Sequence, residues 1–319
     1  MLGRVVEISQ PGRMLRLERG SMIVSDIRSK DELGRIALDQ LGAVLATARG
    51  ITTGSELILA LADRNIPLLY CDRKFVPAAI SWPVESHHTQ SARIEAQATA
   101  TRPLVKRLWQ QIVAAKIRNQ ALSLDYIGEE HGASALAAMS RRVRSGDPEN
   151  LEAQAARRYW PLLFGESFRR NRQDDGINAV LNYAYAILRS ATARAIMASG
   201  LHPSIGLHHS NRYNAMRLVD DLMEPYRPLF DVAAWRLFQA GHNNVTSSVK
   251  SFLAGMFVSD IETDQGTTPL MTALVRTAQS LARAFDGVPR AQLDLPPVID
   301  RKIPLLSLPE PPEAATGSD

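Results

Sequence analysis

The sequence predicts an α+β protein in which a small β-rich N-terminal domain precedes a large all-α C-terminal domain. The main observation is that the hydrophobic period changes once, near residue 82. Short apolar runs of strand length come before this point, and long tracts with helical spacing come after it. A chain of 319 residues can also bury a substantial core and has room for two domains of ordinary size.

The N-terminal domain, residues 1–82, is predicted from apolar runs that are separated by turn residues. The expected strands are one over 5–8, a hairpin with arms over 14–17 and 22–24, and two more over 41–46 and 66–71. Between the last two, residues 53–65 have helical spacing and end at Asn65, a residue type that often follows the last turn of a helix. The prediction is a β-rich domain with one helix.

Residues 83–90 are predicted to be a linker, because proline and small polar residues interrupt both periods there. The α-helical domain, residues 91–294, follows. Its helical tracts are expected over about 89–124, 148–164, 176–199, 213–240 and 265–285. Asp147 and Pro148 have the residue types of a helix start, and Gly200 that of a helix end. The tail, 295–319, contains six prolines and is predicted to be extended and partly disordered.

The charge composition favours a nucleic-acid partner. The chain has 37 basic residues, a formal net charge of +4 and a pI of about 9.3, and only six of the basic residues are lysines. Because the guanidinium group is a planar fork that matches phosphate oxygens, this excess of arginine suits DNA or RNA binding. A GC-rich genome, which prefers arginine codons, is the alternative explanation, and composition alone does not separate the two.

The single cysteine, Cys71, excludes an internal disulfide framework and fits a reducing cytoplasm. No secretory signal is recognisable at the N-terminus. No window approaches the roughly 18 uninterrupted apolar residues that a membrane span requires. The protein is therefore expected to be cytoplasmic and not bound to a membrane.

Residues 206–228 combine two histidines and three carboxylates in a stretch that is otherwise apolar and helical: His208, His209, Asp220, Asp221 and Glu224. Carboxylate oxygens with one imidazole suit Mg²⁺ or Mn²⁺, whereas a softer metal would favour thiolates. The two histidines are adjacent and point in different directions, so at most one is expected to be a ligand. Glu224 can share a helix face with either aspartate, so helix geometry does not choose among the three acids.

Glu152 is a second candidate ligand. On a helix beginning near Pro148, it shares a face with Ala155, Tyr159 and Leu163. A carboxylate on such an apolar face must be protonated, ion-paired or bound to a metal, because an unpaired buried ion is strongly destabilising. A metal site and a structural ion pair with an arginine are both possible at this point.

A polar seam is expected along the helix 176–199. It consists of Asn178, Asn182, Tyr185 and Arg189, which recur at helical spacing on an Ala/Ile/Leu-rich surface. Such a seam is normally a solvated face. Its amide and phenol groups would also suit residues that support a metal ligand or contact a substrate backbone.

Four blocks of this sequence together resemble a known family. The blocks are 150–160, which contains Glu152, then 178–185, 206–209 and 221–228. They are similar to the CRISPR-associated integrase/endonuclease of the spacer-acquisition (adaptation) module. The segment Leu222-Met223-Glu224-Pro225 resembles the form found in the type II branch of that family. The resemblance extends over essentially the whole chain.

The resemblance implies that the helical domain is catalytic and that Glu152, His209 and Glu224 are its Mg²⁺ or Mn²⁺ ligands. Because His208 and His209 are adjacent, it stays open whether the ligand is His209 or, one residue earlier, His208.

The resemblance also implies that Asp221 supports the ligands and that Asp220 is a surface acid. The seam residues that then take supporting roles are Asn178, Asn182 and Tyr185.

The reaction implied by the resemblance is transesterification. In this reaction the 3′-hydroxyl of a captured DNA fragment attacks a phosphodiester at the end of a CRISPR repeat, which inserts a new spacer. The implied partners are double-stranded DNA (prespacer and repeat), a second copy of the chain bound through the N-terminal domain, and a small ferredoxin-like adaptation subunit that completes a heterohexamer. The type II effector nuclease would join during spacer selection. The alternatives are a non-catalytic DNA-binding scaffold and a general metal-dependent nuclease.

Two arginine clusters flank the Glu152 helix and are predicted to contact DNA phosphates. The upstream cluster is Arg141, Arg142 and Arg144, and the downstream cluster is Arg169, Arg170 and Arg172. Ordinary solvated helix faces are the alternative for both.

Overall fold

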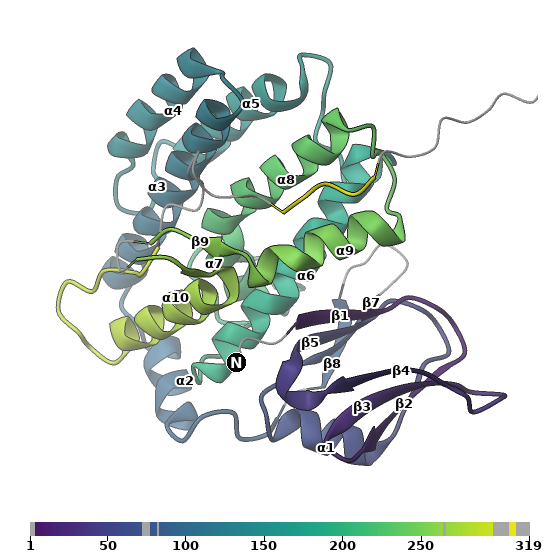
Figure 1. Ribbon diagram of the computed structural model, residues 1–319. Helices are drawn as coiled ribbons and strands as arrows, with labels where there is room; N and C mark the ends of the chain where they lie inside the picture. The colour runs from purple at the N-terminus through teal and green to yellow at the C-terminus, as the bar shows by residue number, and fades with distance from the viewer. Residues whose placement is uncertain (1–3, 72–76, 82, 264–265, 296–305, 311–319) are drawn as a thin grey trace, which may run out of the picture.

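The computed structural model describes residues 4–71, 77–81, 83–263, 266–295 and 306–310. Figure 1 shows strands β1 to β8 gathered at one end of the molecule and most of the helices at the other. The predicted α+β class, with β structure first and helices after it, is confirmed. Within the described ranges, no helix combines the length and the apolar character that a membrane crossing requires.

Two four-stranded sheets form the N-terminal part. The first has the order β1-β5-β7-β8, with β1, β5 and β7 parallel and β8 antiparallel. The second has the order β4-β3-β2-β6. The strands are β1 (Arg4–Ile8), β2 (Arg13–Glu18), β3 (Ser21–Asp26), β4 (Glu32–Ala37), β5 (Leu41–Ala46), β6 (Thr52–Thr53), β7 (Leu68–Cys71) and β8 (Pro77–Ser81). A 3₁₀ turn, η1 (Leu38–Gln40), precedes β5, and α1 (Ser55–Ala62) precedes β7.

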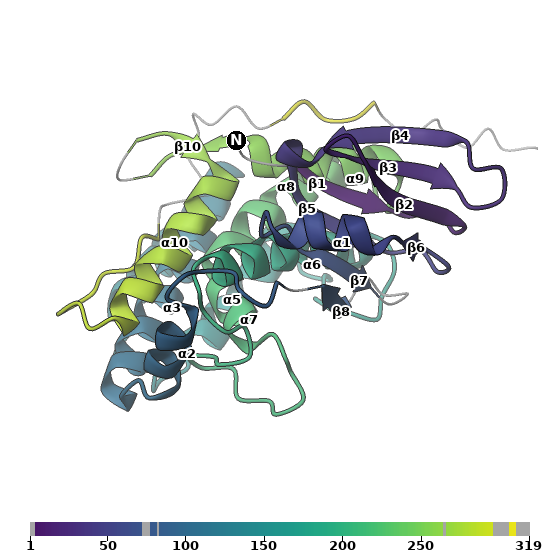
Figure 2. The same ribbon diagram turned by 90° about the horizontal axis from the view of Figure 1, so that it is seen from below.

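Strand β5 joins the two parts of the molecule. All six of its residues are buried, as expected for a central parallel strand that is covered on both faces. Ala43 and Leu45 belong to the same core as the helices, and α6 packs on this strand. Val44 belongs to a second core, which includes residues of the other sheet and of α1. Figure 2 shows α1 beside the strands of the N-terminal part.

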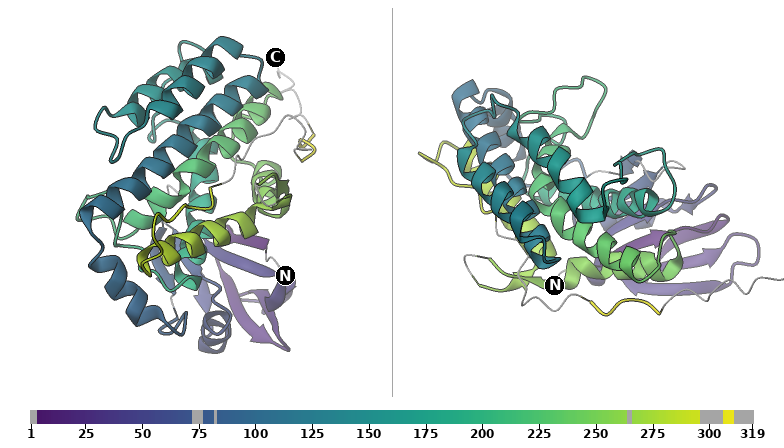
Figure 3. Two further views of the ribbon diagram at one scale, coloured as in Figure 1. Left: turned by 90° about the vertical axis from the view of Figure 1, so that its left-hand side faces the viewer. Right: turned by 90° about the horizontal axis from the view of Figure 1, so that it is seen from above.

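The helical part is built around two long helices, α3 and α6. Figure 3 shows long helices of this part lying side by side, and α3 contacts α4, α5 and α8. The helices are α2 (Gln90–Ala98), α3 (Arg102–Tyr126), α4 (Glu130–Arg142), α5 (Leu151–Phe164), α6 (Ile177–Ala198), α7 (Arg217–Met223), α8 (Arg227–Gln239), α9 (Ser247–Gly255) and α10 (Leu270–Phe285). The shorter elements are η2 (Glu224–Tyr226), η3 (Met256–Val258), β9 (Asp260–Ile261) and β10 (Thr268–Pro269).

Several predicted boundaries were wrong for identifiable reasons. The tract expected over 89–124 is two helices, and the second begins with Pro103 in its first turn. The tract expected over 213–240 is interrupted by η2, because Pro225 and Pro228 have no N–H to continue the helical hydrogen bonds. Two helices, α4 and α9, were not predicted.

The helix expected from Pro148 begins three residues later. The side chain of Asn150 accepts a hydrogen bond from the N–H of Ala153 and is the N-cap of α5. Asp147 still contributes, because its carboxylate accepts hydrogen bonds from the N–H groups of Leu151 and Glu152. Two acceptors thus fix the first turn of α5, on which Glu152 lies.

The segment predicted as a linker is docked on the helical part. Ser86 is buried, and its hydroxyl donates to the carbonyl oxygen of Met197 at the end of α6. Most of the predicted tail lies outside the described residues. The described piece, 306–310, lies against the helices. Arg236 donates to the carbonyl oxygen of Leu306, and Nε2 of His242 contacts the carbonyl oxygen of Pro309.

Candidate functional site

Two of the predicted ligands converge on one buried lysine. Glu152 lies in the first turn of α5, Glu224 begins η2, and Lys116 projects from the middle of α3. Lys116 Nζ is 2.6 Å from Glu152 Oε1 and 2.5 Å from Glu224 Oε2. Acids that are distant in sequence therefore already share a single positive charge. The predicted alternative for Glu152, an ion pair with arginine, is replaced by an ion pair with lysine.

The lysine is charged despite its burial. Its side chain is only 11% exposed. Burial alone would lower the pKa of Lys116, but the negative charges of Glu224 and Glu152 outweigh this effect, and the pKa is raised. Lys116 therefore acts as the counter-ion that keeps two carboxylates together inside the protein.

Glu224 is an ionised and nearly inaccessible carboxylate. It is 2% exposed, and Arg227 Nη1 lies 2.8 Å from its Oε1. Burial would raise the pKa of Glu224, but Arg227 and Lys116 lower it to about 2. Its other oxygen, Oε2, is buried and paired with Lys116 at 2.5 Å. Both oxygens of Glu224 therefore already have cationic partners.

His209 is held in place by Asp221. Its Nδ1 lies 2.6 Å from Asp221 Oδ1, and Asp221 is completely buried. The hydrogen bond that His209 donates to Asp221 raises the pKa of His209 above its usual value. Because Nδ1 is used in this contact, Nε2 is the ring nitrogen that can bind a metal ion. A carboxylate that anchors one nitrogen of a histidine while the other coordinates is a common arrangement at metal sites.

Asp221 also folds the loop that carries the histidines. Its carboxylate oxygens accept hydrogen bonds from the backbone N–H groups of Leu207, His208 and His209, at 2.6, 3.2 and 3.2 Å. Gly206 permits this approach, since a Cβ there would lie 2.9 Å from Asp221 Oδ2. The short Gly-Leu-His-His loop is therefore wrapped around one buried acid.

The two adjacent histidines have different surroundings. His208 is exposed and stacks on Trp109, with ring centroids 4.4 Å apart and planes at 1°. His209 instead faces Asp221, and its charge and that of Glu224 influence each other's pKa. The geometry therefore favours His209 over His208 as the partner of the two glutamates.

The side chains of Glu152, Glu224 and His209 have the donor atoms that suit a divalent metal. No three His, Cys, Asp or Glu side chains in the described part of the chain are grouped closely enough to hold a metal as they stand. The oxygens of Glu152 and Glu224 nevertheless share one cation, and His209 has an anchored ring nearby. Two carboxylates and one imidazole are appropriate ligands for Mg²⁺ or Mn²⁺.

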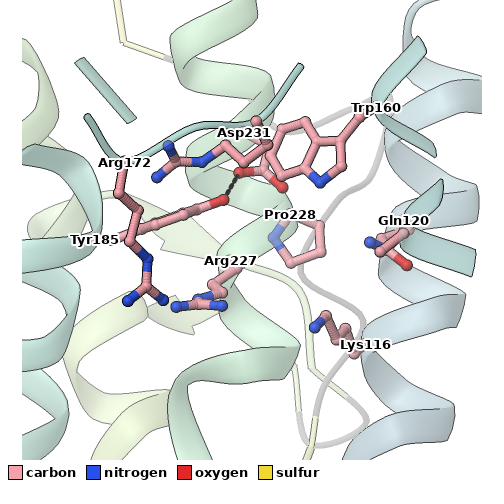
Figure 4. A pocket seen from close by; sticks show the side chains of 10 residues that line it. Lys116, Gln120, Trp160, Arg172, Tyr185, Arg227, Pro228 and Asp231 are labelled. Carbon is pink, nitrogen blue, oxygen red and sulfur yellow. Dashed lines mark hydrogen bonds between the residues drawn. The ribbon is translucent and has the colours of Figure 1, made fainter. Parts of the chain in front are cut away.

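A positively charged pocket of about 210 Å³ adjoins this cluster. Figure 4 shows Lys116, Arg172 and Arg227 among the side chains that line it. Trp160 and Tyr185 provide aromatic surface, and Arg170 and Asp231 are also in the wall. The excess of positive charge suits a phosphate, and the rings suit a nucleotide base.

The predicted polar seam is not a solvated face, and one of its members, Tyr185, lines this pocket. Arg170 donates to the side-chain oxygens of Asn178 and Asn182, at 2.9 and 2.7 Å. The guanidinium carbons of Arg170 and Arg227 lie 5.4 and 4.6 Å from the centre of the Tyr185 ring. Tyr185 therefore supports Arg227, which in turn pairs with Glu224.

Sequence reasoning missed Lys116 and Asp231. Asp231 is buried and accepts a hydrogen bond from the hydroxyl of Tyr185, and burial raises its pKa to about 7. The signal for both was the one that identified Glu152, namely an ionisable residue on an apolar helix face. Lys116 lies four residues after Ile112 on α3, and Asp231 follows Phe230 within a buried run of α8.

Asp220 was wrongly predicted to be a surface acid. Its two carboxylate oxygens accept hydrogen bonds from Arg189, at 2.7 and 3.0 Å, and Asn214 donates to it as well. Arg189, the fourth residue of the seam, thus ties α6 to α7. The helix face that seemed free in the sequence is used in packing between these two helices.

The two arginine clusters are placed differently. Upstream, Arg141, Arg142 and Arg144 are exposed, and the last two pair with Glu149. Downstream, Arg169 is exposed and donates to backbone carbonyl oxygens. Arg170 is turned inward towards the asparagines, whereas Arg172 is exposed and lines the pocket.

The sequence has clear relatives. Residues 6–252 match the family described as CRISPR associated protein Cas1. The chain is 34% identical over 295 residues to a CRISPR-associated endonuclease Cas1 of Neisseria meningitidis serogroup C (strain 8013), covering 92% of this chain and 96% of the relative. It is 30% identical over 239 residues to CRISPR-associated endonuclease Cas1 1 of Francisella tularensis subsp. novicida (strain U112), covering 69% and 74%.

Solved structures with the same fold include a casposase bound to an integration product (TM-score 0.76, 16% identity, covering 94% of this chain and 95% of that one). A CAS1 protein from Thermotoga maritima is similar as well, with a TM-score of 0.73 and 15% identity, and the match covers 90% of this chain and 99% of that one. A chain of a Cas6-RT-Cas1–Cas2 complex has a TM-score of 0.73 and 20% identity, and the match covers 92% of this chain and 36% of that one. At these identities the likeness is one of fold.

Proposed function

Because this chain belongs to the CRISPR associated protein Cas1 family, we propose that it is a metal-dependent DNA endonuclease and integrase that inserts new spacers into a CRISPR array. The observation that best supports this proposal is the convergence of Glu152 and Glu224 on one cation. The anchored imidazole of His209 would complete a ligand set for Mg²⁺ or Mn²⁺.

The proposed reaction is a transesterification. The 3′-oxygen of a captured DNA fragment forms a new bond to a phosphorus atom of the repeat, and the bond from that phosphorus to its original 3′-oxygen breaks. The attacking hydroxyl gives up a proton and the released oxygen gains one, so the step consumes no water and no redox partner. Glu152, His209 and Glu224 would hold a metal ion that, when bound, polarises the scissile phosphate and offsets the charge on both oxygens.

The surrounding residues have separate tasks in this proposal. Asp221 keeps the His209 ring oriented and leaves its Nε2 for coordination. Arg227 holds Glu224 ionised. The positively charged pocket, with Arg172 at its exposed side, would bind a phosphate of the DNA strand and position it beside the glutamates.

The proposed partners follow from the family. They are double-stranded DNA as prespacer and as repeat, a second copy of this chain, and a small ferredoxin-like adaptation subunit that joins two dimers into a heterohexamer. The type II effector nuclease would take part in spacer selection. The similarity in fold to a chain of a Cas1–Cas2 complex supports the partner subunit.

A strand-transfer assay tests this function. A labelled DNA fragment with free 3′-hydroxyls is incubated with a repeat-containing plasmid, Mn²⁺ and the protein, with and without the partner subunit. The expected product is label joined covalently to the plasmid at the repeat, and a fragment ending in a 3′-deoxy nucleotide should give none. DNA binding without joining would favour the scaffold alternative, and cutting without preference for the repeat would favour a general nuclease.

A further inference from the structure

Lys116 occupies the position at which a metal ion would meet both glutamates. Its Nζ lies 2.6 Å from an oxygen of Glu152 and 2.5 Å from an oxygen of Glu224, and its side chain is almost fully buried. The inference below rests on the proposed function, because it concerns how the proposed ligands exchange one cation for another.

An ammonium group and a divalent ion cannot use these oxygens at the same time. Mg²⁺ binds oxygen at about 2.0–2.1 Å and requires lone pairs directed at it. Glu152 Oε1 accepts a hydrogen bond from Lys116, and Glu224 Oε2 is paired with the same ammonium group at 2.5 Å. Two cations placed between the same pair of carboxylates would also repel each other strongly at this distance.

The lysine side chain has a place to move to. Lys116 also lines the adjoining pocket of about 210 Å³. The backbone of α3 can stay in position during such a movement, because Asn119 Nδ2 donates to the carbonyl oxygen of Pro225 at 2.7 Å and ties α3 to η2. The flexible four-carbon stem of lysine can then carry its charge between the two locations.

We propose that Lys116 is a resident counter-ion that the divalent metal replaces. In the metal-free protein it holds Glu152 and Glu224 in their ligand positions and prevents their mutual repulsion. When a divalent ion binds, the ammonium group is displaced from the two glutamates. The lysine thus keeps the site assembled and at the same time sets how tightly a metal can bind.

The test is direct measurement of Mn²⁺ binding by isothermal titration calorimetry on the full-length protein. Lys116→Met removes the competing charge at similar length and should tighten Mn²⁺ binding by about tenfold or more. Lys116→Arg presents a planar fork that can hold both carboxylates, and it should weaken Mn²⁺ binding by about as much. The matched control is Lys106→Met, because Lys106 is an exposed lysine on the same helix, and its substitution should leave the affinity unchanged.

The increase in melting temperature on adding Mn²⁺ gives a second readout. It should be larger for Lys116→Met than for the wild type, because the two glutamates then depend on the metal for charge compensation. If Lys116→Met does not fold without metal, Lys116→Arg alone decides the question. An affinity unchanged in every folded Lys116 variant overturns the inference while leaving the metal site intact.

Failure of the proposed function gives a different result. If Mn²⁺ binds the wild type with the same affinity as Glu224→Gln, then the metal is bound elsewhere, and both proposals fail together. A crystal grown with Mn²⁺ provides an independent check. Anomalous density between Glu152 and Glu224 with Lys116 in its present position would also overturn the exchange.

Discussion

The side chain of Asp221 fixes the ring of His209, since its Oδ1 lies 2.6 Å from the histidine Nδ1. The same carboxylate accepts hydrogen bonds from three consecutive backbone N–H groups of the loop that carries His209. One buried acid therefore controls both the fold of this loop and the direction in which the imidazole can coordinate.

The variant Asp221→Asn should separate this orienting role from coordination itself. Loss of the negative charge should lower the pKa of His209 towards its ordinary value, because the hydrogen bond to Asp221 is the largest cause of the increase. Mn²⁺ affinity should fall by about 10- to 100-fold, the usual effect of removing a residue that orients a metal ligand. NMR titration of the histidines and calorimetry measure the two effects. An unchanged His209 titration would contradict the assigned contact.

The stability of the protein should depend on pH through Asp231. Burial raises the pKa of this carboxyl from 3.8 to about 7, so its neutral form is favoured in the folded state. The stabilising contribution is fully present below about pH 4 and is lost as the pH rises to about 7. The free energy of unfolding of the wild type should therefore decrease across this window relative to Asp231→Asn. Parallel curves of unfolding free energy against pH for the two proteins would show that the carboxyl group of Asp231 is not protonated in the folded state.

The arginine clusters can be tested by the salt dependence of DNA binding. Arg172→Ala should weaken binding and reduce the log-log salt slope by roughly one unit, because this exposed residue lines the pocket. The upstream pair, Arg142 and Arg144, should have smaller effects, since both already pair with Glu149. Fluorescence anisotropy over a range of salt concentrations measures the slopes. Equal slopes in all variants would leave both clusters as solvated faces.

A dimer formed through the N-terminal domain predicts sensitivity at a sheet edge. Strand β4 lies at the edge of its sheet and carries Leu33, which is 54% exposed. Leu33→Lys should shift the protein from dimer to monomer in multi-angle light scattering. Leu162→Lys, at an exposed leucine of the helical part, is the control and should leave the mass unchanged. A monomeric wild type, or a dimer that persists in Leu33→Lys, would contradict an interface at this edge.

The sequence allowed the fold class to be predicted because local patterns were strong. The central strand over 41–46 was a continuous apolar run, and its boundaries were predicted correctly. The interruption of the tract 213–240 by η2 could not be fixed from the sequence, because a proline inside a helical pattern can either end a helix or only bend it. Such a choice depends on packing between elements that local patterns do not describe.

The site was only partly predictable for a related reason. Glu152 could be identified because an acid on an apolar face needs a partner, but the partner itself comes from another helix. Lys116 lies 36 residues before Glu152, and its role depends on how α3 packs against α5 and η2. Asp220 was misjudged in the same way, because Arg189 reaches it from a different helix.

The central claim is that Glu152, His209 and Glu224 together hold the metal ion for strand transfer. The most direct test is the Mn²⁺-dependent strand-transfer assay with Glu152→Ala, His209→Ala and Glu224→Ala, each checked for folding by circular dichroism. The neighbour His208, which stacks on Trp109, provides the matched control. Each of the three variants should lose joining activity, whereas His208→Ala should retain most of it. An active His209→Ala together with an inactive His208→Ala would contradict the assignment and place the other histidine at the metal.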